Sequence, residues 1–163
     1  MKIVKEIISY ALIVLIVILI RTFIITPAMV DGESMEPALN DNELVLISKL
    51  GIKAGKIKRY DIVVVDYEFR SEFLLKRVIG LPGENIMYLN NVLYVNGQEI
   101  DLPFEFEETA NFEATVPEGC YFVLGDNRDV SYDSRMFGSV KLADIKGKAK
   151  FVLFPFNKLR KVK

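Results

Sequence analysis

A strand that ends in a sharp turn is predicted by the run Leu74-Leu75-Lys76-Arg77-Val78-Ile79-Gly80-Leu81-Pro82-Gly83-Glu84. Its first part is largely apolar, and the proline and glycine that follow supply the fixed and the positive φ angles of a turn. Comparable runs predict strands over residues 43–49, 61–67, 73–80, 92–95, 121–124 and 145–154. Further turn signals stand at Asn90-Asn91, Asn96-Gly97 and Pro117-Glu118-Gly119. We therefore predict a mainly β chain with a small antiparallel sheet or barrel.

An apolar run precedes these strands. Residues 7–25 are interrupted only by Ser9, Tyr10, Arg21 and Thr22, and the run is close to the roughly 20 residues that a helix needs to span a bilayer. We interpret it as one transmembrane helix, with Arg21 near the end, where its side chain can reach the lipid headgroups. A cleavable signal peptide is the alternative, but Ile25-Thr26-Pro27-Ala28-Met29 lacks the small-x-small cleavage signature.

Charge around this run predicts its orientation. Lys2 and Lys5 favour a cytoplasmic N-terminus, although Arg21 weakens the asymmetry. The predicted organisation is a short cytoplasmic segment (1–6), a membrane anchor (7–25) and one extracytoplasmic β domain (26–163), whose length fits a single domain of about 50 to 250 residues. The predicted location is therefore the plasma membrane, crossed once.

Composition excludes several classes of protein. Hydrophobic residues make up 51% of the chain and charged residues 26%, which rules out wholesale disorder. The net charge is −1, whereas a protein that binds nucleic acid normally carries a basic excess, so we expect no nucleic-acid partner. The single Cys120 cannot close an internal disulfide and is expected to be a buried strand residue.

Residues 101–116 are the least strand-like part of the domain. Within a predicted hairpin or loop insertion at about 90–116, this segment mixes acidic and aromatic side chains, namely Glu105, Glu107, Glu108 and Glu113 with Phe104, Phe106 and Phe112. It is interpreted as a solvated hairpin or loop, or as a flap close to a substrate.

The chain contains no histidine, so a serine nucleophile would need another base. Ser34 in Gly32-Glu33-Ser34-Met35-Glu36-Pro37 is the candidate nucleophile, and lysine, aspartate or glutamate could accept its proton. A lysine works only when neutral, which requires burial to lower its pKa from about 10.4 towards 7 or 8. Strand alternation places Lys76 on the same face as Leu74 and Val78. The alternatives are a Lys76 ammonium held in water and a Ser34 that only precedes a proline turn.

A third segment adds weight to this pair: Gly125-Asp126-Asn127-Arg128-Asp129-Val130-Ser131-Tyr132-Asp133-Ser134-Arg135-Met136-Phe137-Gly138. With it, the sequence resembles the compact form of the bacterial type I signal peptidases, the Ser-Lys enzymes of peptidase family S26. The shared elements are the apolar anchor, Ser-Met-x-Pro, Asp61-Ile62-Val63, Lys-Arg-x-Ile-Gly-Leu-Pro-Gly-Glu and Gly-Asp-Asn-Arg. They occur in the family's order and cover most of the chain.

The resemblance implies a membrane-bound serine endopeptidase that removes signal peptides from exported preproteins after small-x-small motifs, without a cofactor or metal. It implies that Ser34 is the nucleophile and Lys76 the general base, and that Ser131 hydrogen-bonds and orients the lysine. Asp133 and Arg135 look like a supporting ion pair. Asp126, Asn127 and Arg128 look like scaffold for their loop, and the implied partners are preprotein signal peptides and the lipid bilayer.

Matching positions also suggest residues of the substrate pockets, with core packing as the alternative for each: Val30, Met35, Leu39, Val64 and Leu75. The sequence departs from some relatives at Gly32, where a hydroxyl residue can supply a second oxyanion donor, and at Tyr60 and Met136. The oligomeric state and the preferred preproteins are not predicted.

Three other classes of protein fit the sequence less well. A self-cleaving Ser-Lys regulatory protease would usually carry a DNA-binding or partner domain. A non-enzymatic, membrane-tethered β module would explain the anchor and the strands. The joint presence of Ser34, Lys76 and Ser131 would then be a coincidence. An aspartic or metal-dependent protease would need an Asp-Thr/Ser-Gly pair or histidine ligands, which the sequence lacks.

Overall fold

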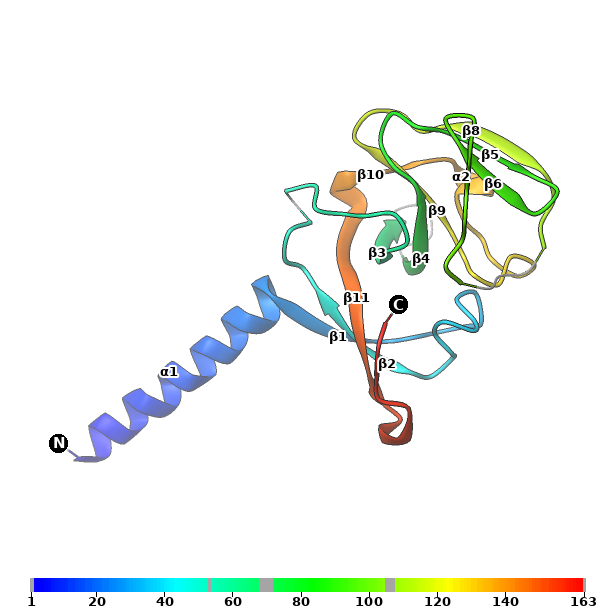
Figure 1. Ribbon diagram of the computed structural model, residues 1–163. Helices are drawn as coiled ribbons and strands as arrows, with labels where there is room; N and C mark the ends of the chain where they lie inside the picture. Colours follow the sequence, from blue (N-terminus) through cyan, green and yellow to red (C-terminus); the bar gives the residue numbers. More distant parts are fainter. Residues whose placement is uncertain (1, 53, 68–71, 105–107, 163) are drawn as a thin grey trace.

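The computed structural model describes residues 2–52, 54–67, 72–104 and 108–162. A long helix, α1 (Lys2–Phe23), projects away from a β domain that contains the C-terminus (Figure 1). Within the described ranges it is the one helix whose length and composition would allow it to cross a membrane, over Ile3–Phe23, and none of that span is buried against the domain. The helix ends before the predicted limit at residue 25 because Pro27 and the β-branched residues ahead of it favour an extended chain.

The larger sheet is antiparallel throughout. Its strand order is β1-β2-β11-β3-β4-β9-β10, and β12 pairs with β11 beside this path. The strands are β1 (Ile25–Met29), β2 (Leu44–Ser48), β3 (Ile62–Tyr67), β4 (Glu72–Gly80), β9 (Cys120–Leu124), β10 (Val140–Lys141), β11 (Ile145–Phe154) and β12 (Arg160–Lys161). Each of the six predicted strands matches an observed one to within one residue at either end, which confirms the mainly β fold class.

A smaller sheet of order β7-β6-β5-β8 packs beside β9 (Figure 1). It consists of β5 (Asn85–Leu89), β6 (Val92–Val95), β7 (Gln98–Ile100) and β8 (Phe112–Thr115). Positive φ angles at Asn90 and Asn91 turn the chain from β5 into β6. Part of the segment predicted as a hairpin or loop is strand β8, in which Phe112 and Ala114 alternate with the exposed Glu113 and Thr115. Residues 105–107 of that segment lie outside the described residues.

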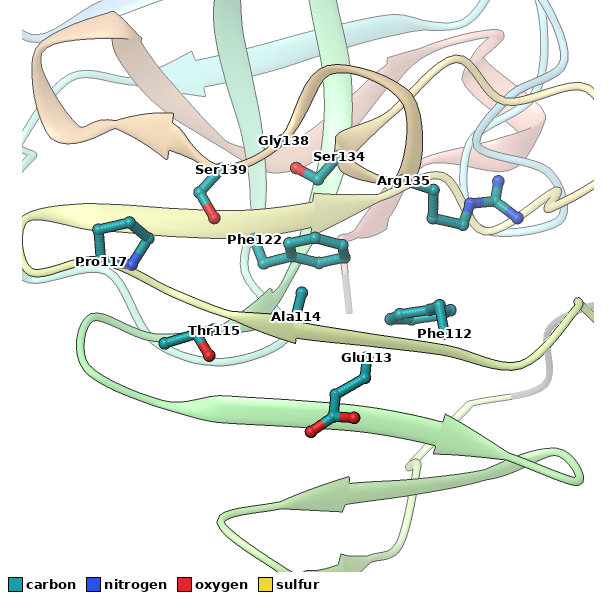
Figure 2. Close-up of a pocket in the computed structure, with 10 residues that line it drawn as sticks. All are labelled: Phe112, Glu113, Ala114, Thr115, Pro117, Phe122, Ser134, Arg135, Gly138 and Ser139. Carbon is teal, nitrogen blue, oxygen red and sulfur yellow. The ribbon is translucent and has the colours of Figure 1, made fainter.

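The edge strand β8 faces β9 and a short helix, α2 (Ser134–Phe137), across a hollow of about 390 Å³ (Figure 2). Phe112 stacks on Tyr88 at 5.6 Å and on Phe122 at 5.7 Å between ring centroids. Figure 2 shows Phe122 between the two strands and Arg135 at one end of the hollow. Aromatic side chains thus pack the smaller sheet against the larger one.

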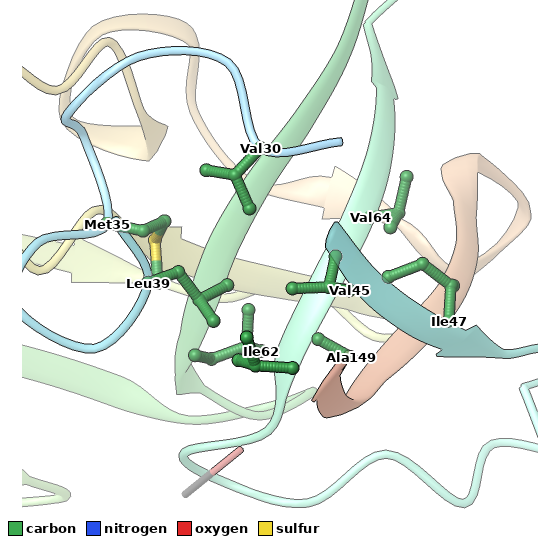
Figure 3. Packing of buried hydrophobic residues seen from close by; sticks show 9 residues of the cluster. Val30, Met35, Leu39, Val45, Ile47, Ile62, Val64 and Ala149 are labelled. Atoms are coloured by element: carbon green, nitrogen blue, oxygen red, sulfur yellow. The ribbon is translucent and has the colours of Figure 1, made fainter. Parts of the chain in front are cut away.

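The described residues also form two 3₁₀ turns, η2 (Leu142–Asp144) and η3 (Phe156–Lys158). The buried apolar residues form three clusters. The first lies between the loop after β1 and the strands β2, β3 and β11, and its residues are Val30, Met35, Leu39, Val45, Ile47, Ile62, Val64, Ala149 and Val152 (Figure 3). Fully burying one such Val, Leu, Ile or Met side chain contributes about 1.5–3 kcal/mol. This cluster holds the loop that carries Ser34 against the sheet.

Gly80 ends β4 where the two sheets meet. A Cβ atom there would stand 2.7 Å from Val116 Cγ2 and 3.0 Å from Phe122 Cβ, so a larger residue would push the sheets apart. The glycine of the Ile-Gly-Leu-Pro-Gly-Glu element therefore has a packing role.

Candidate active site

Ser34 and Lys76 are in direct contact. Lys76 lies in β4, between β3 and β9 in the larger sheet, whereas Ser34 lies in the turn that follows β1. The Lys76 Nζ atom donates a hydrogen bond to Ser34 Oγ at 2.8 Å across 42 residues of sequence. Lys76 is only 2% exposed, which excludes the alternative in which its ammonium points into water. The residues therefore have the geometry of a nucleophile and its base.

Burial is the main influence on the pKa of Lys76. Desolvation lowers that pKa from 10.5 to about 8, against the opposing effect of the Asp133 and Asp126 charges and with a smaller lowering by Arg135. An ammonium is penalised in a poorly hydrated site because its charge loses water contacts. A substantial fraction of Lys76 is therefore neutral in mildly alkaline solution, as a general base requires.

The Asp133–Arg135 ion pair is present, with Arg135 Nε 2.8 Å from Asp133 Oδ1. Asp133 is fully buried; its carboxylate caps α2 by accepting from the Arg135 backbone N–H and also accepts from Gly125 N at 3.0 Å. Arg135 donates onward to Thr109 Oγ1 and to the Arg128 carbonyl, both at 2.7 Å. The pair joins β9, α2 and the 125–135 loop into one unit.

Ser131 does not make the expected hydrogen bond to Lys76. Its Oγ atom is buried and has no hydrogen-bond partner among the described residues. The hydroxyl packs beside Gly125, where a Cβ atom would overlap it and would also collide with the Ser34 carbonyl oxygen. Ser131 therefore fills the space next to a glycine, at the point where the Gly125 backbone also approaches the Ser34 carbonyl oxygen.

Asp126 and Asn127 hold the Gly-Asp-Asn-Arg segment in place. Asp126 accepts from Arg77 Nε at 2.8 Å and from Arg77 Nη2 at 2.6 Å, and both side chains are only 2% exposed. The Arg77 guanidinium also lies over the Phe104 ring, 4.1 Å from its centroid. Asn127 N donates to the Ser34 carbonyl at 3.3 Å. The partner of Arg77 was not predicted, although strand alternation does place Arg77 on the face opposite Lys76.

A second set of hydrogen bonds, which the sequence did not predict, holds the loop after Ser34 in place. Arg160 of β12 donates to the Ala38 carbonyl at 2.8 Å and to the buried Glu43 carboxylate. Glu43 also accepts from Asn40 N at 3.1 Å. The sequence offers no local signal for this network, because 117 residues separate Glu43 from Arg160.

The residues suggested for substrate pockets come together but are largely core. Val30, Met35, Leu39 and Val64 all belong to the first cluster (Figure 3). Leu75 is packed against it. Val64 also lines an open, mainly apolar cavity of about 450 Å³ with Ala28, Ile47 and Phe73. A separate hollow of about 420 Å³ lies beside Ser34 and is lined by the acidic residues Asp31, Glu33 and Asp41.

In the parts of the chain that the structure describes, no group of three His, Cys, Asp or Glu side chains is placed to hold a metal ion.

Comparisons with known proteins identify the family. Residues 3–154 match the model of the family described as signal peptidase, peptidase S26. A signal peptidase I of Bacillus caldolyticus is 40% identical over 88% of this chain and 87% of its own length. A signal peptidase IB of Staphylococcus aureus is 36% identical over 98% of this chain and 93% of its own length. A crystal structure of a signal peptidase I from Enterococcus faecalis is similar at 38% identity, with a TM-score of 0.52 over 57% of this chain and 96% of that one. The chain therefore belongs to the signal peptidase family, peptidase S26, and is a serine endopeptidase.

Proposed function

We propose that this chain cleaves N-terminal signal peptides from exported preproteins after small-x-small motifs, with Ser34 as nucleophile and neutral Lys76 as general base. The observation that carries the proposal is the 2.8 Å contact between Lys76 Nζ and Ser34 Oγ at a lysine that is 2% exposed. The names of the relatives, signal peptidase I and IB, support the substrate class.

In this mechanism the neutral Lys76 amine accepts the Ser34 proton as Oγ attacks the scissile carbonyl. The resulting ammonium then protonates the leaving amine, which frees the mature protein and leaves an acyl group on Ser34. Water attacks the ester while Lys76 accepts a proton from it, and Lys76 returns that proton to Ser34 Oγ as the bond to the acyl group breaks and the signal peptide leaves. Asp133 and Arg135 keep the 125–135 loop beside the dyad, which is the supporting role we propose for them.

The oxyanion formed at the scissile carbonyl needs hydrogen-bond donors aimed at it. We propose the Ser34 backbone N–H as the first donor. The Gly32 N–H already donates to Asp41 Oδ1 at 2.8 Å, and Gly32 has no side chain that could contribute. The second donor is then another backbone group or a water molecule.

Two free strand edges suggest how an extended substrate binds. β1 is the outer strand of its sheet, and β4 pairs with β9 only from Arg77 onward. Within the described residues, the part of β4 from Glu72 to Lys76 thus has an open side. A peptide that adds to these edges would place alternate side chains towards the first cluster and the Val64 cavity. We propose that the small residues of the motif are read there.

We also propose that α1 anchors the domain in the plasma membrane, with the N-terminus cytoplasmic and the domain extracytoplasmic. The apolar span Ile3–Phe23 and the basic residues Lys2 and Lys5 ahead of or near its start support this orientation. A signal peptide also lies in the bilayer, so tethering raises the effective concentration of its cleavage site near Ser34.

The test is incubation of the purified intact chain, in detergent or lipid, with a labelled preprotein, followed by mass analysis of the products. We expect one cut after a small-x-small motif and none with the Ser34→Ala variant, whose folding is checked by thermal unfolding. Cleavage that persists in Ser34→Ala, or cuts confined to this chain itself, would reject the proposal; the second result would indicate a self-cleaving protease.

A further inference from the structure

We propose that a cavity at the C-terminal end of α1 binds the headgroup of one anionic phospholipid. The proposal rests on the membrane anchorage proposed above. The cavity encloses about 1020 Å³ and lies between the end of α1, the loop after β2 and the start of β11. Its lining includes Thr22 and Phe23 of the helix together with Lys49 and Lys146.

The position of the helix places the cavity at the depth of lipid headgroups. A helix rises about 1.5 Å per residue, so the 21 residues of the apolar span extend about 32 Å, close to the roughly 30 Å hydrocarbon thickness of a bilayer. When this span crosses the membrane, Phe23 reaches the boundary between hydrocarbon and headgroups. A cavity lined by Phe23 then opens at that boundary.

The cations in the lining match a phosphate group. Lys49 Nζ donates to the Thr22 carbonyl at 3.0 Å, and so offsets the negative end of the α1 dipole. Lys146 Nζ donates to the Ala143 carbonyl at 3.1 Å and pairs with Asp66 at 3.2 Å. Each ammonium carries three N–H donors. Among the described residues, two donors of Lys49 and one of Lys146 therefore have no protein partner and can bind phosphate oxygens.

The remaining lining suits the apolar part of a lipid. Phe23 is 66% exposed and Leu50 is 59% exposed, although both are large hydrophobic residues beside the cavity. Contiguous exposed apolar surface commonly marks a site of protein or membrane contact. An acyl chain that lies along Phe23 and Leu50 would cover this surface while the phosphate contacts the lysines.

Two lysines favour a phospholipid over a signal peptide as the occupant, because the apolar segment of a signal peptide offers no anion. Lys49 and Lys146 also line the apolar cavity that contains Val64. The same two ammonium groups therefore stand between the proposed lipid site and the proposed substrate pocket.

The test is native mass spectrometry of the intact, delipidated chain in neutral detergent, titrated separately with dioctanoyl phosphatidylglycerol and dioctanoyl phosphatidylcholine. We expect the wild type to retain one phosphatidylglycerol in preference to phosphatidylcholine. The Lys49→Gln/Lys146→Gln variant should lose about 30-fold in apparent affinity for phosphatidylglycerol, as expected for two surface lysines facing an anionic lipid. The control is Lys58→Gln/Lys158→Gln, which removes the same charge from exposed positions outside the lining and should bind as the wild type does.

A second variant fills the cavity without changing its charge. Ala54→Trp places a bulky side chain at an exposed lining position and should also weaken phosphatidylglycerol binding; thermal unfolding checks the fold of every variant. Equal binding by the Lys49→Gln/Lys146→Gln variant, or no preference between the lipids in the wild type, overturns the proposal. So does displacement of the bound lipid by a synthetic signal peptide, which would assign the cavity to substrate.

Cleavage of a preprotein is measured in the same samples. A chain that binds phosphatidylglycerol without cleaving preproteins would reject the proposed function alone, whereas a chain that cleaves them without retaining the lipid would reject the lipid site alone.

Discussion

Arg160 donates through Nη1 and Nη2 to the two carboxylate oxygens of Glu43, at 2.8 and 2.7 Å. Glu43 is 1% exposed. Burial raises its pKa, but the hydrogen bonds from Arg160 and Asn40 outweigh this effect and hold the pKa below 4.5. Through the bond to the Ala38 carbonyl, the last strand of the chain restrains the loop that presents Ser34.

We expect Arg160→Ala to lower the free energy of unfolding by about 2 kcal/mol at pH 7. Breaking a fully buried pair costs about 3–5 kcal/mol, and the smaller value allows for an arginine side chain that is 33% exposed. Because the pKa of Glu43 is lowered by folding, this stabilisation is present above pH 4.5 and is lost as the pH falls below it.

Urea unfolding of the two proteins at a series of pH values measures this difference. Lys161→Ala, which removes the exposed neighbouring cation, is the matched control and should unfold as the wild type does. A difference that stays constant down to pH 3 would show that Arg160 does not act through the Glu43 charge.

The pH dependence of cleavage should report the titration of Lys76. We expect kcat/KM on one preprotein to rise with pH through a midpoint of about 8, the pKa to which burial lowers this lysine, because only the neutral amine accepts the Ser34 proton. Lys76→Arg should be as inactive as Lys76→Ala, since a guanidinium stays protonated. Steady-state rates between pH 6 and 10 measure both effects; substantial turnover by Lys76→Arg would mean that the position supplies charge alone.

The buried Lys76 should also lower the free energy of unfolding of the chain. Its pKa in the folded chain is about 8 instead of 10.5, a difference worth about 3 kcal/mol. We expect Lys76→Met to unfold with a higher free energy than the wild type by up to that amount at pH 7. The penalty is fully present below pH 8 and disappears as the pH rises from 8 to 10.5, because the unfolded chain binds the extra proton in that window.

Chemical unfolding of both proteins from pH 7 to 10.5 measures the gap. Lys58→Met, at an exposed position, controls for the loss of one charge. A gap between Lys76→Met and the wild type that does not narrow above pH 8 would contradict the lowered pKa.

Asp126→Asn should destabilise the fold strongly. Removing the charge breaks the buried ion pair between Asp126 and Arg77, at a cost of about 3–5 kcal/mol, because both side chains are 2% exposed. Glu84→Gln, which weakens the more exposed Arg59–Glu84 pair, should cost less. Thermal or urea unfolding ranks the two variants, and equal losses would show that burial does not set the strength of these pairs.

Chelators should leave cleavage unchanged, because the proposed reaction uses Ser34, Lys76, hydrogen-bond donors and water and assigns no step to a metal ion. The measurement is the initial rate on a preprotein before and after dialysis against EDTA. Loss of activity that one added divalent metal restores would argue against the Ser-Lys mechanism.

The sequence predicted the strands whose composition is regular and whose ends carry turn residues, such as 92–95 between Asn90-Asn91 and Asn96-Gly97. The strands that it did not predict include β1, because Ile25 continues the apolar run of α1, and β8, because Glu113 and Thr115 resemble loop residues when the partner strand β5 is unknown.

The contact of Ser34 with Lys76 was predicted because a chain without histidine offers few bases for a serine, and because the surrounding motifs resemble one family. The hydrogen bond expected from Ser131 to Lys76 is not seen among the described residues, since sequence does not determine which way a buried hydroxyl points beside Gly125. Glu43 and Arg160 meet only through tertiary structure.

A single residue, Ile24, separates α1 from β1. Its N–H continues the helix by donating to Ile20, and its carbonyl accepts from Lys49 N at 2.9 Å, as in a strand pair. The chain thus leaves no flexible linker in which the domain could swivel. In a membrane-anchored enzyme, Ser34 would then lie at a constant height above the bilayer. The rigid connection between α1 and β1 would set this height. It would select cleavage sites by the length of polar chain between a substrate's apolar segment and its scissile bond.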